Sequence, residues 1–246
     1  MKSFASFSLA LLAVLVSVSA GKTERAAKAT SLRHYMGYTG PSQTGVHFDF
    51  LTYDADLNLV GLDNQIRSAC QAGLWMVYEN IEYNYFEPGN VCIVPALEDC
   101  FDLSAACSGM VSSLRYAGSS EGMNDDFYNM YGAINYQGLE FKGNNTSRDV
   151  GILQGDVSSV IVSGTGSWTF YTDREFNGAS VCVVPDSKYL GSDGTALNYG
   201  LFQNLGELGL SDGGIGSLIK GCFSDTVVSA EAVRAKREAA ASAGLA

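Results

Sequence analysis

The chain has 246 residues, of which 46% are hydrophobic and 17% charged, and its formal net charge is −11. The acid is concentrated in the middle: between Tyr38 and Phe223 there are 22 acidic and seven basic residues. A surface this acidic repels nucleic-acid backbones and anionic lipid and favours cations or basic partners. Solubility alone is the alternative interpretation of the same charge.

The N-terminus has the pattern of a secretory signal peptide. Residues 1–20 contain one lysine near the start, an apolar run from Leu9 to Val16 and small residues before position 21. The run is too short for a bilayer of about 30 Å, and no later segment approaches the length of a membrane span. We therefore expect a secreted protein without a membrane span. A flanking arm at residues 21–44 is expected to follow the signal peptide at residues 1–20.

The middle of the chain contains an internal duplication. The segments Trp75–Pro95 and Trp168–Pro185 each end in Val-Cys-(Ile or Val)-Val-Pro, and Cys92 and Cys182 lie 90 positions apart. A repeat of this size indicates two similar domains.

Within each copy, short runs rich in β-forming residues alternate with Gly, Asn, Asp and Ser. This pattern predicts an all-β protein. The expected strands of the first copy are Trp75–Tyr78, Val91–Val94 and Ser112–Tyr116, and those of the second are Trp168–Tyr171, Val181–Val184 and Ser217–Gly221.

The second copy contains an aromatic pair at an unusual spacing. Tyr171 and Phe176 are five residues apart, so they point to opposite faces of a straight strand and can meet only if the chain turns between them. Gly178 supplies the positive φ with which such a turn re-enters a sheet. Related spacings occur at Tyr136–Phe141–Gly143, at Phe48–Tyr53–Ala55 and, with an insertion, at Tyr78–Phe86–Gly89.

The six cysteines divide evenly between the copies, which favours disulfides within each domain. We expect Cys182 to pair with Cys222. The other four, Cys70, Cys92, Cys100 and Cys107, pair either as Cys70–Cys92 with Cys100–Cys107 or in another of the three arrangements. A zinc site is disfavoured because the chain has no Cys-x-x-Cys and both histidines are remote in sequence.

The spacing aromatic, four residues, aromatic, one residue, glycine, followed by a strand and a loop that ends in serine, resembles the Greek key of the βγ-crystallins. The resemblance implies two Greek key β-sandwich domains, each made of two keys. The implied divisions are domain 1 at 45–118 (keys 45–73 and 74–118), a linker at 119–130, domain 2 at 131–223 (keys 131–164 and 165–223) and a tail at 224–246.

The resemblance also implies calcium loops, because many members of the family bind Ca²⁺ through a six-residue loop in each key that supplies oxygen ligands. The corresponding loops are Asp63–Ser68, Ser108–Ser113, Gln154–Ser159 and Asp212–Ser217, and none is complete. The departures are complementary, and the surviving candidate ligands are Asp63, Asn64 and Ser112 in domain 1 and Ser158 and Asp212 in domain 2. We expect at most one weak site per domain; the alternative is ordinary turns whose final serines cap strands.

Three further features concern the surface. Asn144 and Asn145 begin overlapping glycosylation sequons. Trp75 and Trp168 are expected in the core, with a sugar-stacking surface as the alternative. The tail is expected to be loosely ordered, with a short amphipathic helix as the alternative, and Lys236-Arg237 is a candidate processing site.

These features predict a secreted, non-enzymatic protein with a structural or extracellular binding role, whose partner is a calcium ion or an unidentified extracellular protein or glycan. A toxin, an antimicrobial protein or a protease inhibitor on the same fold is the alternative. A polysaccharide hydrolase would need carboxylates clustered in one cleft. Nothing in the sequence predicts a catalytic residue or an organic cofactor.

Overall fold

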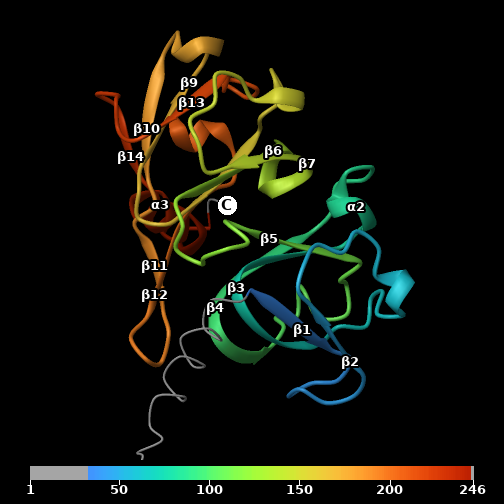
Figure 1. The fold of residues 1–246 in the computed structure, drawn as a ribbon. Coiled ribbons are helices and arrows are strands. Elements are labelled where there is room, and N and C mark those ends of the chain that lie inside the picture. Colours follow the sequence, from blue (N-terminus) through green and yellow to red (C-terminus); the bar gives the residue numbers. More distant parts are fainter. Residues whose placement is uncertain (1–32, 245–246) are drawn as a thin grey trace, which may run out of the picture.

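The computed structural model describes residues 33–244 (Figure 1). The predicted signal peptide at 1–20 and the first part of the predicted arm, 21–32, lie outside the described residues. Within residues 33–244, no helix is both long enough and apolar enough to cross a membrane.

The first five strands form the N-terminal unit, residues 34–117. They are β1 (His34–Tyr38), β2 (His47–Phe50), β3 (Ser68–Tyr78), β4 (Val91–Asp102) and β5 (Ser113–Ala117). The sheet order is β2-β1-β3-β4, and β5 pairs with β3. The predicted arm at 21–44 therefore ends too late in the chain, because β1 lies inside it and pairs with β3.

Strands β3 and β4 run through both layers of the N-terminal unit. Residues 68–72 of β3 pair with β1, whereas residues 74–78 pair with β5, and β4 accompanies β3 throughout. The register of β3 and β4 shifts between Gln71 and Ala72, and the next residue, Gly73, has φ of +104°. A bulge with a positive-φ glycine bends a strand, so one strand supplies two layers.

The last nine strands form the C-terminal unit, residues 127–229. They are β6 (Phe127–Ala133), β7 (Gln137–Gly143), β8 (Ser159–Ser163), β9 (Trp168–Tyr171), β10 (Ser180–Val184), β11 (Ser187–Leu190), β12 (Ala196–Phe202), β13 (Ser217–Lys220) and β14 (Val227–Ser229). Two sheets result, with orders β11-β12-β8-β6-β7 and β13-β9-β10-β14. Strands β11 and β12 follow β10 in sequence but lie in the other sheet, where β12 pairs with β8; this is the exchange expected of a Greek key.

Short helical turns connect the strands. They are η1 (Leu57–Val60), α2 (Ile81–Asn84), η2 (Ile134–Tyr136), η3 (Gly151–Leu153), η4 (Arg174–Phe176) and η5 (Leu205–Leu208).

Strand alternation divides the apolar side chains between cores inside the units and a core between them. On β3, Trp75 and Val77 face the N-terminal unit's own core, whereas Leu74, Met76 and Tyr78 face the C-terminal unit. Side chains alternate in the same way on the opposing strand β8. Ile161 faces the core shared by the two units, whereas Val160 and Val162 face the core of the C-terminal unit. The two units therefore bury an extended apolar contact, and both tryptophans are core residues, not a sugar-stacking surface.

Two buried arginines reinforce this contact. Arg115 of β5 donates hydrogen bonds to the Tyr78 hydroxyl at 2.8 Å and, across the interface, to the carbonyls of Tyr136 and Gly138 at 2.7 and 3.0 Å. Arg33 donates to the carbonyl of Ser119, and burial lowers the pKa of Arg33 to about 10. Because a guanidinium has five donors and no acceptor, it can satisfy several buried carbonyls at once.

All six cysteines form disulfides within one unit or the other. Cys182 pairs with Cys222, as predicted. In the N-terminal unit the bonds are Cys70–Cys100 and Cys92–Cys107, so the arrangement given first above, Cys70–Cys92 with Cys100–Cys107, is wrong. The reason is the pairing of β3 with β4, which places Cys70 directly opposite Cys100.

The tail is ordered and helical. Helix α3 (Ala230–Ser242) begins at the N-cap Ser229, whose hydroxyl accepts a hydrogen bond from the N–H of Ala232. Ala230 belongs to the core of the C-terminal unit, which anchors the helix there. Arg237 donates to the Leu201 carbonyl from a half-buried position. The expectation of a loosely ordered tail is therefore wrong, because packing of Ala230 and capping by Ser229 fix the helix.

Candidate functional site

Four sharp corners repeat through the chain, one after the first strand of each Greek key. Each corner contains two consecutive non-glycine residues with φ between 50° and 63°. The pairs are Ser42-Gln43, Glu82-Tyr83, Asn135-Tyr136 and Glu175-Phe176, and a tyrosine (Tyr38, Tyr78, Tyr131 or Tyr171) lies five positions before the second member.

One of the four corners lies where the sequence predicts it. The rings of Tyr171 and Phe176 meet edge to face with centroids 6.0 Å apart. The hairpins predicted at Phe48–Ala55 and Tyr136–Gly143 are wrong in register, because the real corners lie at Tyr38–Gly45 and Tyr131–Gly138. In the hairpin predicted at Tyr78–Phe86–Gly89, the second aromatic residue of the corner is Tyr83 and not Phe86. The insertion therefore follows the aromatic pair and does not divide it.

A buried serine closes every corner. Its hydroxyl accepts a hydrogen bond of 2.9 to 3.1 Å from the backbone N–H of the second positive-φ residue. The hydroxyl also donates a hydrogen bond of 2.6 to 2.7 Å to the carbonyl of the residue three positions before that second positive-φ residue. The four are Ser68, Ser113, Ser159 and Ser217, the last residues of the four predicted calcium loops. Their hydroxyls are committed to holding strained backbone, so they are not free ligands.

In the N-terminal unit the two predicted loops lie against each other in an antiparallel register. The N–H of Asn64 donates to the Val111 carbonyl at 2.9 Å, and the N–H of Gly109 donates to the Ile66 carbonyl at 2.8 Å. This register sets Asp63 opposite Ser112. It also sets Arg67 opposite Ser108.

The C-terminal unit repeats the arrangement. The N–H of Gly213 donates to the Val157 carbonyl at 2.9 Å, which corresponds to the bond between Asn64 and Val111. The same register sets Asp212 opposite Ser158 and Gly216 opposite Gln154. Each unit therefore has one position where an aspartate faces a serine. Its second position has no carboxylate: it pairs Arg67 with Ser108 in the N-terminal unit and Gly216 with Gln154 in the C-terminal unit.

The donor chemistry of these positions suits calcium only in part. Asp63 with Ser112, and Asp212 with Ser158, supply the oxygen ligands that Ca²⁺ requires. At the second position of the N-terminal unit, the Arg67 guanidinium lies against Gly109 and introduces a cation. At the second position of the C-terminal unit, Gly216 has no hydroxyl, although the buried side-chain oxygen of Gln154 has no hydrogen-bond donor. Within residues 33–244, no group of three or more His, Cys, Asp or Glu side chains is placed to hold a metal.

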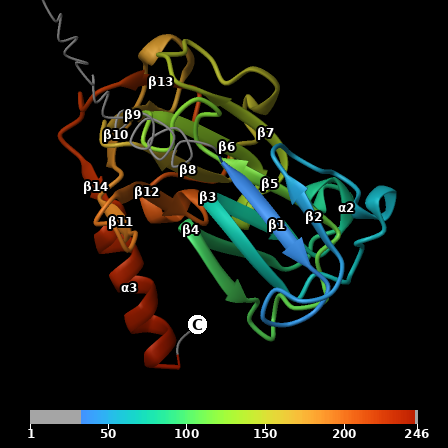
Figure 2. The ribbon, with the colours of Figure 1, turned by 60° about the horizontal axis from the view of Figure 1, so that its bottom comes forward.

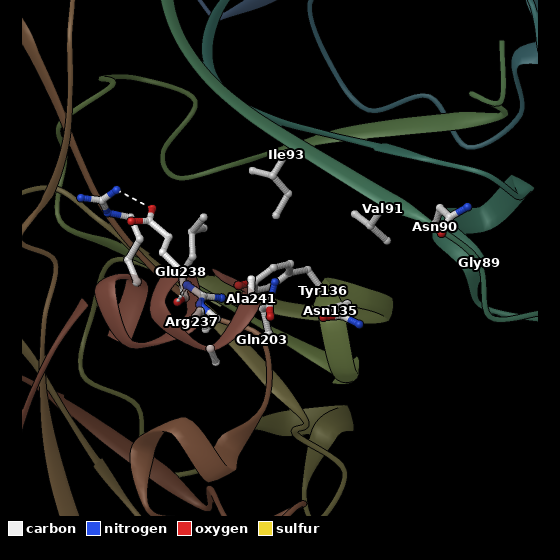
Figure 3. A pocket seen from close by; sticks show the side chains of 13 residues that line it. Gly89, Asn90, Val91, Ile93, Asn135, Tyr136, Gln203, Arg237, Glu238 and Ala241 are labelled. Carbon is white, nitrogen blue, oxygen red and sulfur yellow. Dashed lines mark hydrogen bonds and ion pairs between the residues drawn. The ribbon is translucent and has the colours of Figure 1, made fainter. Parts of the chain in front are cut away.

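A separate groove lies between the two units and helix α3 (Figure 3). Its volume is about 740 Å³; Val91 and Ile93 of β4 face it from one side, and Gln203 and Arg237 line the other. Arg237 also lies 3.6 Å from Glu207, whose carboxyl pKa is raised by burial and partly lowered again by Arg237. Figure 2 shows α3 projecting beside the edge of β4, which this groove separates from the helix.

The glycosylation candidates Asn144 and Asn145 are exposed in the loop after β7. The Asn145 amide donates to the side-chain oxygen of Asn144 at 2.7 Å. A surface position of this kind is compatible with the modification.

Comparison with known proteins gives a match in structure only. No protein-family model matches the sequence, and no curated protein matches it. Geodin, a βγ-crystallin from Geodia cydonium, is 19% identical, covers 77% of this chain and 99% of its own, and has a TM-score of 0.57. An archaeal βγ-crystallin is 21% identical, covers 39% of this chain and 99% of its own, and has a TM-score of 0.31. A βγ-crystallin from Ciona intestinalis is 22% identical, covers 38% of this chain and 98% of its own, and has a TM-score of 0.30.

The chain has the βγ-crystallin fold: it is an all-β protein of two Greek key β-sandwich domains. The four serine-closed corners and the exchange of β12 between sheets agree with this assignment. The sequence placed the four serines at the ends of the predicted loops but did not identify their hydrogen-bond partners, and it gave no role to Arg115. A tyrosine five residues before a second aromatic, matched to a later serine, was the available signal for three of the four corners.

Proposed function

We propose that the protein is a secreted, non-enzymatic βγ-crystallin-type protein with a structural or extracellular binding role and one weak calcium site in each domain. The domains, predicted at 45–118 and 131–223, correspond to the N-terminal and C-terminal units. The strands of these units begin earlier, at His34 and Phe127, and those of the second unit end later, at Ser229. Three disulfides support an oxidising compartment, where such bonds persist.

The non-enzymatic part of the proposal is supported by how the carboxylates are used. Glu98, Asp99 and Asp102 are close in sequence but engage different groups. Glu98 lies 3.6 Å from His34, Asp99 accepts from the Tyr189 hydroxyl, and Asp102 accepts from the N–H of Ser42. A pair of carboxylates set across one cleft, which glycoside hydrolysis needs, does not form from these residues.

The calcium part of the proposal is carried by one observation: in each unit the loop register sets one aspartate opposite one serine. Asp63 with Ser112, and Asp212 with Ser158, would hold the ion, aided by Asn64 in the first case. Two side-chain oxygens and neighbouring carbonyls give a weak site, with Kd of about 10⁻⁴ to 10⁻³ M.

Calorimetric titration of the intact secreted protein with calcium tests this proposal. We expect two sites per chain, and one site after either Asp63→Asn or Asp212→Asn. Calcium at ten times Kd stabilises the folded state by about 1.4 kcal/mol per site, so the thermal midpoint must rise as well. Ser108→Ala is the matched control, because Ser108 faces Arg67 and is expected to change neither result. A stoichiometry that is unaffected by both aspartate variants contradicts the assignment.

A further inference from the structure

An apolar groove lies where the α2 corner of the N-terminal unit meets the η2 and η3 segments of the C-terminal unit. Its volume is about 690 Å³. Four large apolar side chains line it and remain exposed: Tyr85 at 51%, Ile134 at 52%, Leu139 at 43% and Ile152 at 67%. Single exposed apolar residues are ordinary, but several that converge on one groove mark an interaction surface.

The apolar surface continues beyond the groove. Phe86 is 77% exposed, and its ring packs edge to face against Tyr85 with centroids 4.9 Å apart. Exposed aromatic side chains of this kind are the usual anchors of protein interfaces.

Two buried amides, those of Asn84 and Gln137, line the groove and form hydrogen bonds within the protein. The Asn84 amide donates to the Gln137 side-chain oxygen at 2.9 Å, and the Asn84 oxygen accepts from the N–H of Asn80. The Gln137 amide donates to the Ile134 carbonyl at 3.2 Å. Both amides are engaged within the protein, and the large exposed side chains of the lining are the four apolar ones named above, so the groove favours apolar side chains.

One carboxylate lines the groove, and a second, exposed one adjoins a lining residue in the sequence. Asp156 lines it, and Glu87 stands between Phe86 and the lining residue Pro88. Neither carboxylate forms an ion pair within residues 33–244, whereas Glu140, Glu175 and Glu238 each have a basic partner there. An apolar groove with unpaired carboxylates at its edge is complementary to a ligand with apolar side chains and positive charge.

The two walls of the groove are held together in advance. Arg115 of the N-terminal unit donates to the Gly138 carbonyl, beside Leu139, and the Tyr78 hydroxyl donates to the Tyr136 carbonyl at 2.8 Å. A preformed groove avoids the ordering cost that weakens binding by mobile surfaces.

We propose that this groove binds a polypeptide segment of a partner protein in which apolar side chains are flanked by Lys or Arg. The inference rests on the extracellular binding role proposed above and names the class of partner. It does not depend on calcium, because the proposed ligands Asp63, Asn64, Ser112, Ser158 and Asp212 do not line the groove. Asp156 lines the groove and belongs to the Gln154–Ser159 loop, but it is not one of the proposed ligands.

The test uses the intact secreted protein and a fluorescent peptide of Leu and Lys that places all Leu side chains on one face. Binding is followed by fluorescence anisotropy in calcium and again in chelator. We expect Ile152→Ser and Phe86→Ser each to raise Kd by about tenfold or more, the loss typical of one large apolar contact. The double variant Glu87→Gln/Asp156→Asn is expected to raise Kd and to reduce its dependence on salt.

Matched controls are available because Leu190 and Phe223 are exposed to 66% and 64% outside the groove. Leu190→Ser, Phe223→Ser and the charge control Glu121→Gln/Asp225→Asn are expected to leave Kd unchanged. Equal losses in groove and control variants overturn the proposal. The absence of peptide binding also overturns it. The proposal fails as well if Ile152 and Phe86 affect only binding to phosphatidylcholine vesicles, or only self-association measured by ultracentrifugation. Binding that persists in chelator supports the groove even if calorimetry detects no calcium.

Discussion

The two units reach the same Greek key pairing by different routes. In the N-terminal unit, β3 and β4 are 11 and 12 residues long and each serves both layers. In the C-terminal unit the corresponding step is made by two separate strands, β8 and β9, of five and four residues. The comparison shows that strand pairing defines this fold, while the number of continuous strands does not.

The two routes coincide with different means of stabilisation. The main core of the C-terminal unit has 17 buried residues, and this unit has one disulfide. The main core of the N-terminal unit has only 12 buried residues, but this unit has two disulfides. A smaller core supplies less hydrophobic free energy, so cross-links carry a larger share of the stability.

The largest expected effect is therefore loss of the N-terminal disulfides. Their cysteines are 30 and 15 residues apart, and those of the C-terminal bond are 40 apart. Loop-closure entropy gives about 3 to 4 kcal/mol for each bond, so replacing Cys70, Cys92, Cys100 and Cys107 by serine removes about 6 kcal/mol or more. Denaturant unfolding followed by near-ultraviolet circular dichroism should show the N-terminal unit unfolding first. Earlier loss of the C-terminal unit in this variant would refute the comparison.

Arg115→Met tests whether the units depend on each other. The substitution removes three buried hydrogen bonds, to the oxygens of Tyr78, Tyr136 and Gly138, at about 1 kcal/mol or more each. The Tyr136 carbonyl keeps the hydrogen bond from the Tyr78 hydroxyl. We expect a loss of at least about 3 kcal/mol and the separation of one calorimetric unfolding transition into two. Arg67→Met, at an exposed position, is the control and should leave a single transition. One transition in both variants would mean that apolar contact alone couples the units.

The corner serines allow a comparison at matched positions. Ser113→Ala and Ser159→Ala each remove an acceptor and a donor from buried backbone groups, at a cost of about 2 kcal/mol. Equal shifts of the thermal midpoint are expected, since the geometry is the same in both units. A shift confined to one unit would show that its corner is supported by other contacts.

The smallest effect concerns the corner that has lost its second aromatic. Gln43 occupies the place that Phe176 fills against Tyr171. We expect Gln43→Phe to stabilise the N-terminal unit by about 0.5 to 1.5 kcal/mol through a ring pair with Tyr38. Phe176→Gln is the reciprocal change and should destabilise the C-terminal unit. Thermal melts of both variants measure the two effects, and a destabilising Gln43→Phe would contradict the proposed equivalence.

The sequence predicted some parts of the fold well because they depend on local pattern. The Tyr171–Gly178 corner was found since its two aromatics and its glycine are all present. The corner at Tyr38–Gly45 was missed because Gln43 removes the second aromatic, and Tyr136 was assigned to the wrong end of its corner because aromatics stand five positions away on both sides, at Tyr131 and Phe141.

The amino-acid sequence by itself determined the duplication, the all-β class, the spacing of the four serines and the Cys182–Cys222 bond, because these follow from repeats and residue types along the chain. Only the tertiary structure decided the remaining disulfides, the opposition of Asp63 to Ser112 and of Asp212 to Ser158, the burial of Arg115 and the apolar groove. Each of these depends on which distant segments lie side by side. That arrangement is set by strand register and by packing between the two units, and neither is contained in the spacing of residues along one segment.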